Sequence, residues 1–170
     1  MARKGDIDLE GMRDAAAAAA NARWDTLETV LSVHGAPQTF NEIAQKQGVA
    51  LDFRDPTYDK DAIDPVRQEY HSQPAIEALR KSDLVGFMDS YDESFHGHTR
   101  EPYVAEHRAG ALPAYAFLSA ETEWLAPGEM GWFGMSSDNW ASRLEYYDKV
   151  NAIIDAAPDD AWLTMLDCHI

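Results

Sequence analysis

The feature that most constrains the fold is a change of pattern in the last third of the chain, residues 115–170. Residues 115–118 are apolar and aromatic, and residues 123–126 return with a tryptophan and a leucine after a short polar turn. Two such runs predict strands joined as a hairpin. Apolar residues then recur at helical spacing: Trp140, Leu144, Tyr147, Val150 and Ile154. This spacing predicts an amphipathic helix, with Ser136 or Ser137 as its N-cap.

The end of the chain predicts one more strand. A proline followed by two aspartates at residues 158–160 is typical of a turn, and residues 162–170 are mainly apolar. A hairpin, a helix that covers one face and a final C-terminal strand can form a small antiparallel sheet. We therefore expect an α+β fold in which several N-terminal helices pack around this sheet. The length is enough for one domain over residues 1–170, with an α+β core over residues 70–170.

The N-terminal part of the chain is predicted to be helical. Residues 1–34 are rich in alanine, and a long helix over residues 6–33 follows from an apolar stripe at helical spacing: Ala16, Ala20, Trp24, Leu27 and Leu31. Thr39 and Glu42 have the spacing of a capping box, which predicts a second helix that begins there. Gly48 is expected to end that second helix, because glycine adopts the left-handed conformation readily.

Further helices are expected in the middle of the chain. Residues 70–89 carry a helical pattern, in which a second short helix is expected to start at Ser82 and Asp83. Thr99 is placed to cap another helix that Gly110 ends. The segment between these helices is polar and is interpreted as a loop.

The charge of the chain is strongly negative. The net charge is −16, from 30 acidic and 14 basic residues. Residues 111–170 contain ten of the acids and two of the bases, so they carry −8, which is half of the excess. Such a field repels phosphate backbones, so direct binding of nucleic acid is not expected, whereas a basic protein or nucleoprotein complex is attracted. Solubility alone is the other explanation of this charge.

We take two sets of acidic residues as the candidate partner-binding site. The first lies in the C-terminal third: Glu121, Glu123, Glu129, Asp138, Glu145, Asp148, Asp155, Asp159 and Asp160. The second lies in a proline-containing segment, residues 52–65: Asp52, Asp55, Asp59 and Asp61. The second set resembles a calcium loop, but it lacks the central glycine and the closing glutamate of an EF-hand. We therefore interpret it as an acidic loop.

Three other patterns are candidates for chemistry, each with a plainer structural interpretation. His96 and His98 alternate near carboxylates, so they either ligate a metal or lie in a solvated loop. Residues 128–138 place three glycines before a helix, which suits either an anion at the helix N-terminus or simple packing. Cys168 and His169 are adjacent, and adjacent residues on a strand point to opposite faces, so Cys168 is interpreted as a core residue. No catalytic residue and no cofactor is assigned.

The sequence favours a cytoplasmic protein. No apolar run approaches the roughly 20 residues that a membrane-spanning helix needs. The first residues are basic but lack the apolar stretch of a secretory signal. The single cysteine excludes an intramolecular disulfide, which is consistent with a reducing compartment.

A composite pattern runs through the second half of the chain. It comprises Gly128-Glu-Met-Gly-Trp-Phe-Gly-Met-Ser-Ser-Asp138, then Pro158-Asp159-Asp160 and the terminal Asp167-Cys-His-Ile170, with Tyr70-His71-Ser-Gln73-Pro74 upstream. This pattern resembles that of small uncharacterised proteins from actinobacteria and their phages. The resemblance covers the chain from about residue 70 onward. It implies a shared domain and no known activity.

Three functions are open from the sequence. The charge, the small size and the resemblance favour an acidic inhibitor, encoded by a phage, that imitates nucleic acid and docks on a basic surface of a host defence or nuclease complex. The first alternative is a small metal-dependent hydrolase that uses His96, His98 and nearby carboxylates. The second alternative is a structural or regulatory adaptor that forms homo-oligomers through the helix of residues 1–34.

Overall fold

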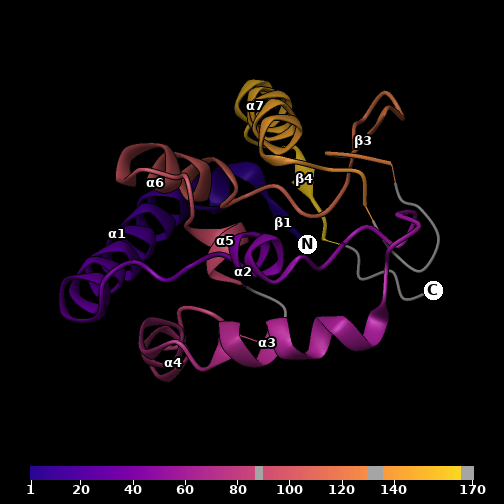
Figure 1. Ribbon diagram of the computed structural model, residues 1–170. Coiled ribbons are helices and arrows are strands. Elements are labelled where there is room, and N and C mark those ends of the chain that lie inside the picture. The colour runs from indigo at the N-terminus through magenta and orange to yellow at the C-terminus, as the bar shows by residue number, and fades with distance from the viewer. Residues whose placement is uncertain (87–89, 130–135, 166–170) are drawn as a thin grey trace. The chain divides into compact units, whose positions relative to one another are not determined.

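The computed structural model describes residues 1–86, 90–129 and 136–165 (Figure 1). Within these residues, seven α-helices accompany two antiparallel sheets of two strands each, which confirms the predicted α+β fold. The helices are α1 Leu9–His34, α2 Phe40–Gln47, α3 Ile63–His71, α4 Pro74–Lys81, α5 Tyr91–Ser94, α6 Arg100–Ala109 and α7 Trp140–Ala156. The strands are β1 Ala2–Arg3, β2 Phe117–Leu118, β3 Trp124–Leu125 and β4 Trp162–Leu163. Two short 3-10 helices, η1 Lys4–Asp6 and η2 Lys60–Ala62, precede α1 and α3.

The chain divides into two compact units. We call residues 1–20 with 101–170 the terminal unit, and residues 21–100 the middle unit. Helix α1 supplies residues to both of them. The terminal unit therefore joins the first residues of the chain to its last third. One domain over residues 1–170 stays a prediction.

The middle unit buries the second half of the stripe predicted for α1. Trp24 and Leu27 are buried, and the ring of Trp24 meets Phe95 edge-on, with 6.2 Å between the centroids. Other side chains that the middle unit buries almost completely are Ile43, Val66, Ile76 and Leu79. Trp24 and Leu27 of α1 are therefore covered by the chain itself.

Helix α2 begins and ends as its sequence predicts. The hydroxyl of Thr39 accepts a hydrogen bond from the backbone N–H of Glu42 at 3.1 Å, and the carboxylate of Glu42 accepts one from the N–H of Thr39 at 2.7 Å. Gly48 ends the helix in the left-handed region, at φ 69°. The capping box and the glycine stop are thus confirmed.

The terminal unit holds both sheets, and their pairing differs in part from the expectation. The hairpin is confirmed, because β2 pairs antiparallel with β3. The final strand starts at Trp162 but pairs with β1, at the beginning of the chain, and not with the hairpin. Backbone hydrogen bonds continue this pairing from Lys4 to Ala161 at 2.8 Å and from Gly5 to Asp159 at 2.9 Å. The expectation that the hairpin and the final strand form one sheet was therefore wrong. The strand that pairs with the final strand comes from residues 2–3, which carry no strand pattern in the sequence.

Helix α7 carries the core of the terminal unit. Its residues Tyr146, Val150 and Ile154 are buried, and hydrophobic side chains from other segments pack against them: Leu9, Leu112, Phe117, Leu125 and Leu163. Trp140, placed on the apolar stripe by its spacing, is partly exposed. The N-cap is Asn139, so the expected caps Ser136 and Ser137 were wrong. Asparagine is as strong an N-cap as serine, and Asn139 directly precedes Trp140, the first residue of the helix.

Two expectations for the middle unit were also wrong. Ser82 closes α4, and Asp83 adopts a left-handed conformation with φ 54°, so no helix starts at these residues. The polar segment expected to be a loop contains the short helix α5, which Ser90 caps by accepting a hydrogen bond from the N–H of Glu93. Both differences concern single turns, where local hydrogen bonding outweighs hydrophobic spacing.

None of the helices in the described part of the chain has the length and apolar character that crossing a membrane requires.

The capping box gives a stability prediction. Replacing Thr39 by Ala removes the hydroxyl that accepts from the Glu42 N–H, so the free energy of unfolding should fall by about 1 kcal/mol. Thr39→Ser keeps this acceptor and should retain most of the stability. Urea denaturation of both variants measures the difference; equal loss in Thr39→Ser and Thr39→Ala would contradict the role of the cap.

Candidate functional site

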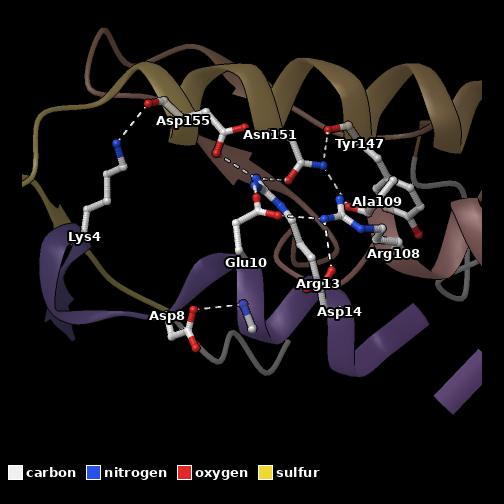
Figure 2. A network of polar contacts seen from close by, with 11 residues as sticks. Lys4, Asp8, Glu10, Arg13, Asp14, Arg108, Ala109, Tyr147, Asn151 and Asp155 are labelled. Carbon is white, nitrogen blue, oxygen red and sulfur yellow. Dashed lines mark hydrogen bonds and ion pairs between the residues drawn. The ribbon is translucent and has the colours of Figure 1, made fainter. Parts of the chain in front are cut away.

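A buried arginine organises the terminal unit. Arg13 on α1 is 6% exposed. Its Nη2 donates to Asn151 Oδ1 at 3.0 Å and to Asp155 Oδ1 at 2.8 Å, both on α7, and its Nη1 donates to Glu10 (Figure 2). Charge-assisted hydrogen bonds of this kind compensate a buried guanidinium for its lost hydration. This arrangement fixes one face of α7 against the start of α1.

Glu10 extends this network to α6. One oxygen of its carboxylate accepts from Arg13, and the other accepts from Arg108 Nη2 at 2.6 Å (Figure 2). Arg108 also donates to Asp14 at 3.2 Å. Hydrogen bonds from Arg13 and Arg108 lower the pKa of Glu10. Burial works against the charge on Arg13, but hydrogen bonds to Asp155 and Glu10 outweigh it, so the pKa of Arg13 is raised.

Asn151 connects the same network to the backbone. Its Nδ2 donates to the carbonyls of Ala109, at the end of α6, and of Tyr147, one turn earlier on α7, both at 2.8 Å (Figure 2). The carbonyl of Ala109 belongs to the last turn of α6, where backbone acceptors lack partners within the helix. Asn151 therefore satisfies a helix end while its oxygen holds Arg13.

Lys4 holds the other end of α7. Its ammonium donates to the carbonyls of Asp155 at 2.9 Å and Ala157 at 2.6 Å. A cation at a helix C-terminus satisfies the last carbonyls and complements the helix dipole. Residues from the first 13 positions of the chain thus contact α7 both along its length and at its C-terminal end.

The structure separates the acids of the C-terminal third into paired and unpaired ones. Asp155 is bound to Arg13, Asp138 to Arg143 at 3.2 Å, and Glu145 to Lys149 at 2.7 Å. A hydrogen bond from the Ser136 hydroxyl, with a smaller effect of Arg143, lowers the pKa of Asp138. Asp159 lies 3.9 Å from Lys4 and is 88% exposed, so that pair is loose. Exposed acids with no ion-pair partner among the described residues are Glu121, Glu123, Glu129, Asp148 and Asp160.

Four exposed acids of the terminal unit lie on α7 and on the β2–β3 hairpin. Glu145 and Asp148 are exposed on α7, and Glu121 and Glu123 lie in the turn of the β2–β3 hairpin and beside it. Lys149 donates to Glu145 one turn earlier on α7, and this hydrogen bond is the main cause of the raised pKa of Lys149, with a smaller contribution in the same direction from the charge of Glu123. We call Glu121, Glu123, Glu145 and Asp148 the hairpin–helix acidic surface.

The aspartates of the second set belong to the middle unit and shape their own loop. The side chains of Asp52, Asp55 and Asp59 each accept a hydrogen bond from a backbone N–H two residues later, at 2.9, 2.8 and 2.9 Å. These Asx turns give the segment its local conformation. All three, and Asp61, are exposed. The two sets of acids thus lie in different compact units.

The histidine candidates are not brought together as a metal site. In the described residues, no group of three or more histidine, cysteine, aspartate or glutamate side chains is placed to hold a metal ion. Asp92, a nearby carboxylate, instead accepts from the N–H of Phe40 at 2.6 Å and from the hydroxyl of Tyr70 at 3.2 Å. It fastens α5 to the start of α2 and to α3. The ring of His96 lies against Tyr91, with 6.1 Å between the centroids.

The glycine-rich loop is described only at its two ends. Glu129 and Ser137 exchange hydrogen bonds there: the Glu129 N–H donates to the Ser137 hydroxyl at 2.9 Å, and the Ser137 N–H donates to the Glu129 carbonyl at 3.0 Å. A Cβ on Gly128 would lie 2.5 Å from the backbone nitrogen of Asp138, so glycine is required at this close approach. The side chain of Asn139 already accepts from two N–H groups of the first turn of α7. These two backbone N–H groups, at the helix end where an anion was a candidate ligand, therefore already donate to the Asn139 side chain.

Residues 130–135 of that loop, and Cys168 with His169, lie outside the described residues. The interpretation of Cys168 as a core residue stays a prediction.

Comparison of the chain with family models, curated proteins and solved structures finds no match. The resemblance to small actinobacterial and phage proteins therefore stays a prediction. The physical arrangement of the side chains is what bears on function.

One feature of the β2–β3 hairpin was not predicted. Leu118 and Trp124, which face each other across the hairpin, are 57% and 68% exposed. Strand alternation would have placed one side chain of each strand outward, but the sequence does not say which. This apolar pair lies beside Glu121 and Glu123 in the same hairpin.

The Arg13 network gives a prediction for pH dependence. The pKa of Glu10 is lower in the folded protein than its ordinary value of 4.5. A depressed carboxyl pKa stabilises the fold fully above the unfolded value, and this contribution is lost as the pH falls through the folded value. The stability difference between wild type and Glu10→Gln should therefore be constant above about pH 5 and shrink below pH 4.5.

Chemical denaturation at a series of pH values measures this difference. Glu101→Gln on α6 is the matched control, since Glu101 is exposed and has no ion pair within the described residues. Its stability difference should stay small and flat. A Glu10→Gln difference that grows as the pH falls would contradict the assigned role of Glu10.

Proposed function

We propose that the protein binds a basic protein partner through the hairpin–helix acidic surface. The observation that carries this proposal is that the hairpin and α7 of one compact unit expose four carboxylates, of which only Glu145 has an ion-pair partner, Lys149, among the described residues. Glu121 and Asp148 add two exposed, unpaired charges. A surface with one dominant sign attracts a partner of opposite sign and speeds their association.

The partner class that fits this surface best is a protein that binds nucleic acid. Along α7, Glu145 and Asp148 are separated by about 4.5 Å of helix rise. Phosphates of one DNA strand follow each other at about 3.4 Å along the axis. Carboxylates at comparable intervals can meet the same lysines and arginines. We therefore propose that the protein acts as a nucleic-acid mimic that occupies its partner's nucleic-acid site.

The finer form of the proposal is an inhibitor of a host defence or nuclease complex, encoded by a phage. Its support is the net charge of −16, the short chain and the resemblance of the C-terminal pattern. Arg13 and Lys4 hold α7, so the part of the acidic surface that α7 carries, Glu145 and Asp148, is in place before a partner arrives. Preorganisation of this kind reduces the entropic cost of binding.

The test is capture of host proteins on the immobilised protein, after nuclease treatment of the extract, with washes at low and high salt. A basic protein should be retained at low salt and released both by high salt and by added duplex DNA, because screening and competition act on the same charges. Retention that ignores salt, or release by salt but not by DNA, would contradict mimicry.

Matched charge variants locate the binding surface. Neutralising the acidic surface, with Glu121→Gln, Glu123→Gln, Glu145→Gln and Asp148→Asn, should weaken the binding of the captured protein about tenfold or more. The control changes the net charge equally but in the middle unit, with Asp61→Asn, Asp64→Asn, Glu77→Gln and Asp83→Asn. The control should retain its binding. Loss in the control and not in the first variant would assign binding to the middle unit instead.

A further inference from the structure

Residues 1–5, which we call the N-terminal strap, lie along the last strand of the terminal unit. β1 pairs antiparallel with β4, and Figure 1 shows β1, in indigo, beside β4, in yellow. The backbone N–H groups of Lys4 and Gly5 continue this pairing by donating to the carbonyls of Ala161 and Asp159. The strap is therefore bound in the way in which an extended peptide adds a strand to the edge of a sheet.

Two adjacent cations of the strap contact the surface beneath it. The guanidinium of Arg3 lies over the ring of Trp162, 5.5 Å from its centroid, which is within the range of a cation–π contact. The ammonium of Lys4 donates to the last carbonyls of α7 and lies 3.9 Å from the carboxylate of Asp159 (Figure 2). β4 and the C-terminal end of α7 thus bind an extended segment both by its backbone and by two neighbouring cations.

The contacts that hold the strap are mainly polar. None of residues 1–5 is buried, and Met1 is 83% exposed. Among the described residues, the hydrophobic cluster of α7 takes Leu9 from this part of the chain and no residue of the strap. Two paired strands are marginally stable by themselves, and a segment with few buried apolar contacts opens at a low cost in free energy. The strap can therefore leave this surface while α7 stays packed.

We infer that β4 and the C-terminal end of α7 form a binding site for an extended basic segment of a partner protein, and that the strap fills this site as an autoinhibitory ligand. A partner segment with two adjacent cations displaces the strap and pairs with β4. One of its cations then lies over Trp162, and the next meets the last carbonyls of α7. The site uses none of the residues of the hairpin–helix acidic surface, so the inference goes beyond the proposed function.

The probe is a peptide of residues 1–5 that carries a dye at its C-terminus. A comparison peptide contains the same five residues in scrambled order and therefore has the same charge. The full chain with Arg3→Ser and Lys4→Ser, in which the strap is weakened, should bind the first peptide at least tenfold more tightly than the wild type does. A closed strap reduces the apparent affinity to the fraction of molecules in which the site is open. Fluorescence anisotropy measures both affinities, and the scrambled peptide should show no such gain.

The matched control is the full chain with Arg54→Ser and Lys60→Ser. These substitutions remove the same two charges from the middle unit, where the guanidinium of Arg54 also lies over an aromatic ring, that of Phe53. This control should bind both peptides as the wild type does. An equal gain in the control would assign the effect to net charge and overturn the inference.

Trp162→Ser, added to the strap-weakened chain, tests the site itself. It removes the ring under the first cation and should weaken the binding of the first peptide about threefold. Trp124→Ser is its control, because Trp124 is also mostly exposed but lies on β3 of the hairpin. The control should leave the affinity unchanged. Equal affinities in these two variants would contradict the assigned site.

Hydrogen exchange in the wild type tests the opening of the strap without any substitution. The amides of Lys4 and Gly5 should exchange much faster than those of Tyr146 and Val150, which lie within α7. Equal protection would show that the strap opens only when the unit unfolds, and it would overturn the inference.

The remaining outcomes concern what fills the site. Equal binding of the two peptides by the strap-weakened chain would reduce the effect to charge and overturn the inference, as would wild-type binding that is equally tight. A wild-type dimer in sedimentation that Arg3→Ser and Lys4→Ser dissociate would assign the strap to a second copy of the chain and overturn its autoinhibitory role. Each of these results leaves the proposed function intact, because the hairpin–helix acidic surface is unchanged in these variants.

Discussion

The terminal unit depends on the ion pairs and hydrogen bonds of one buried guanidinium. Arg13 joins α1 to α7 directly, and through Glu10 it also joins α6. A buried charge is costly unless every donor finds a partner, so the network tolerates little displacement of the three helices. The apolar cluster of Tyr146, Val150 and Ile154 supplies the burial beside it. Hydrophobic packing holds α7 in place, and Arg13 specifies its orientation.

This arrangement determines which acids a partner can reach. Asp155 belongs to the network, and Asp138, just before the N-cap of α7, pairs with Arg143 on that helix, so both contribute less attraction than their formal charge suggests. Glu121 and Asp148 have no such partner among the described residues. In the terminal unit, the hairpin and α7 are therefore among the places where a partner meets carboxylates that no described cation pairs with.

Local features of the fold were predictable from the sequence, and long-range ones were not. The capping box at Thr39 and the stop at Gly48 involve hydrogen bonds within a few residues, so the residue types alone indicate them. The Arg13 to Asp155 bond spans 142 positions, and the β1–β4 ladder joins the two ends of the chain through two residues each. Neither has a periodic pattern that could have revealed it. For the same reason the candidate acids could be identified from the sequence, but which of them form ion pairs could not be predicted.

Charge and apolar surface contribute different properties to recognition. A carboxylate surface attracts many basic proteins, and its reach is limited to about 10 Å at 0.1 M salt, so by itself it gives speed and little selectivity. An exposed apolar pair attracts partners of either charge. In the hairpin, the register presents Trp124 and Leu118 on one face and Glu123, opposite buried Ser119, on the other, so the apolar pair and that carboxylate belong to different faces.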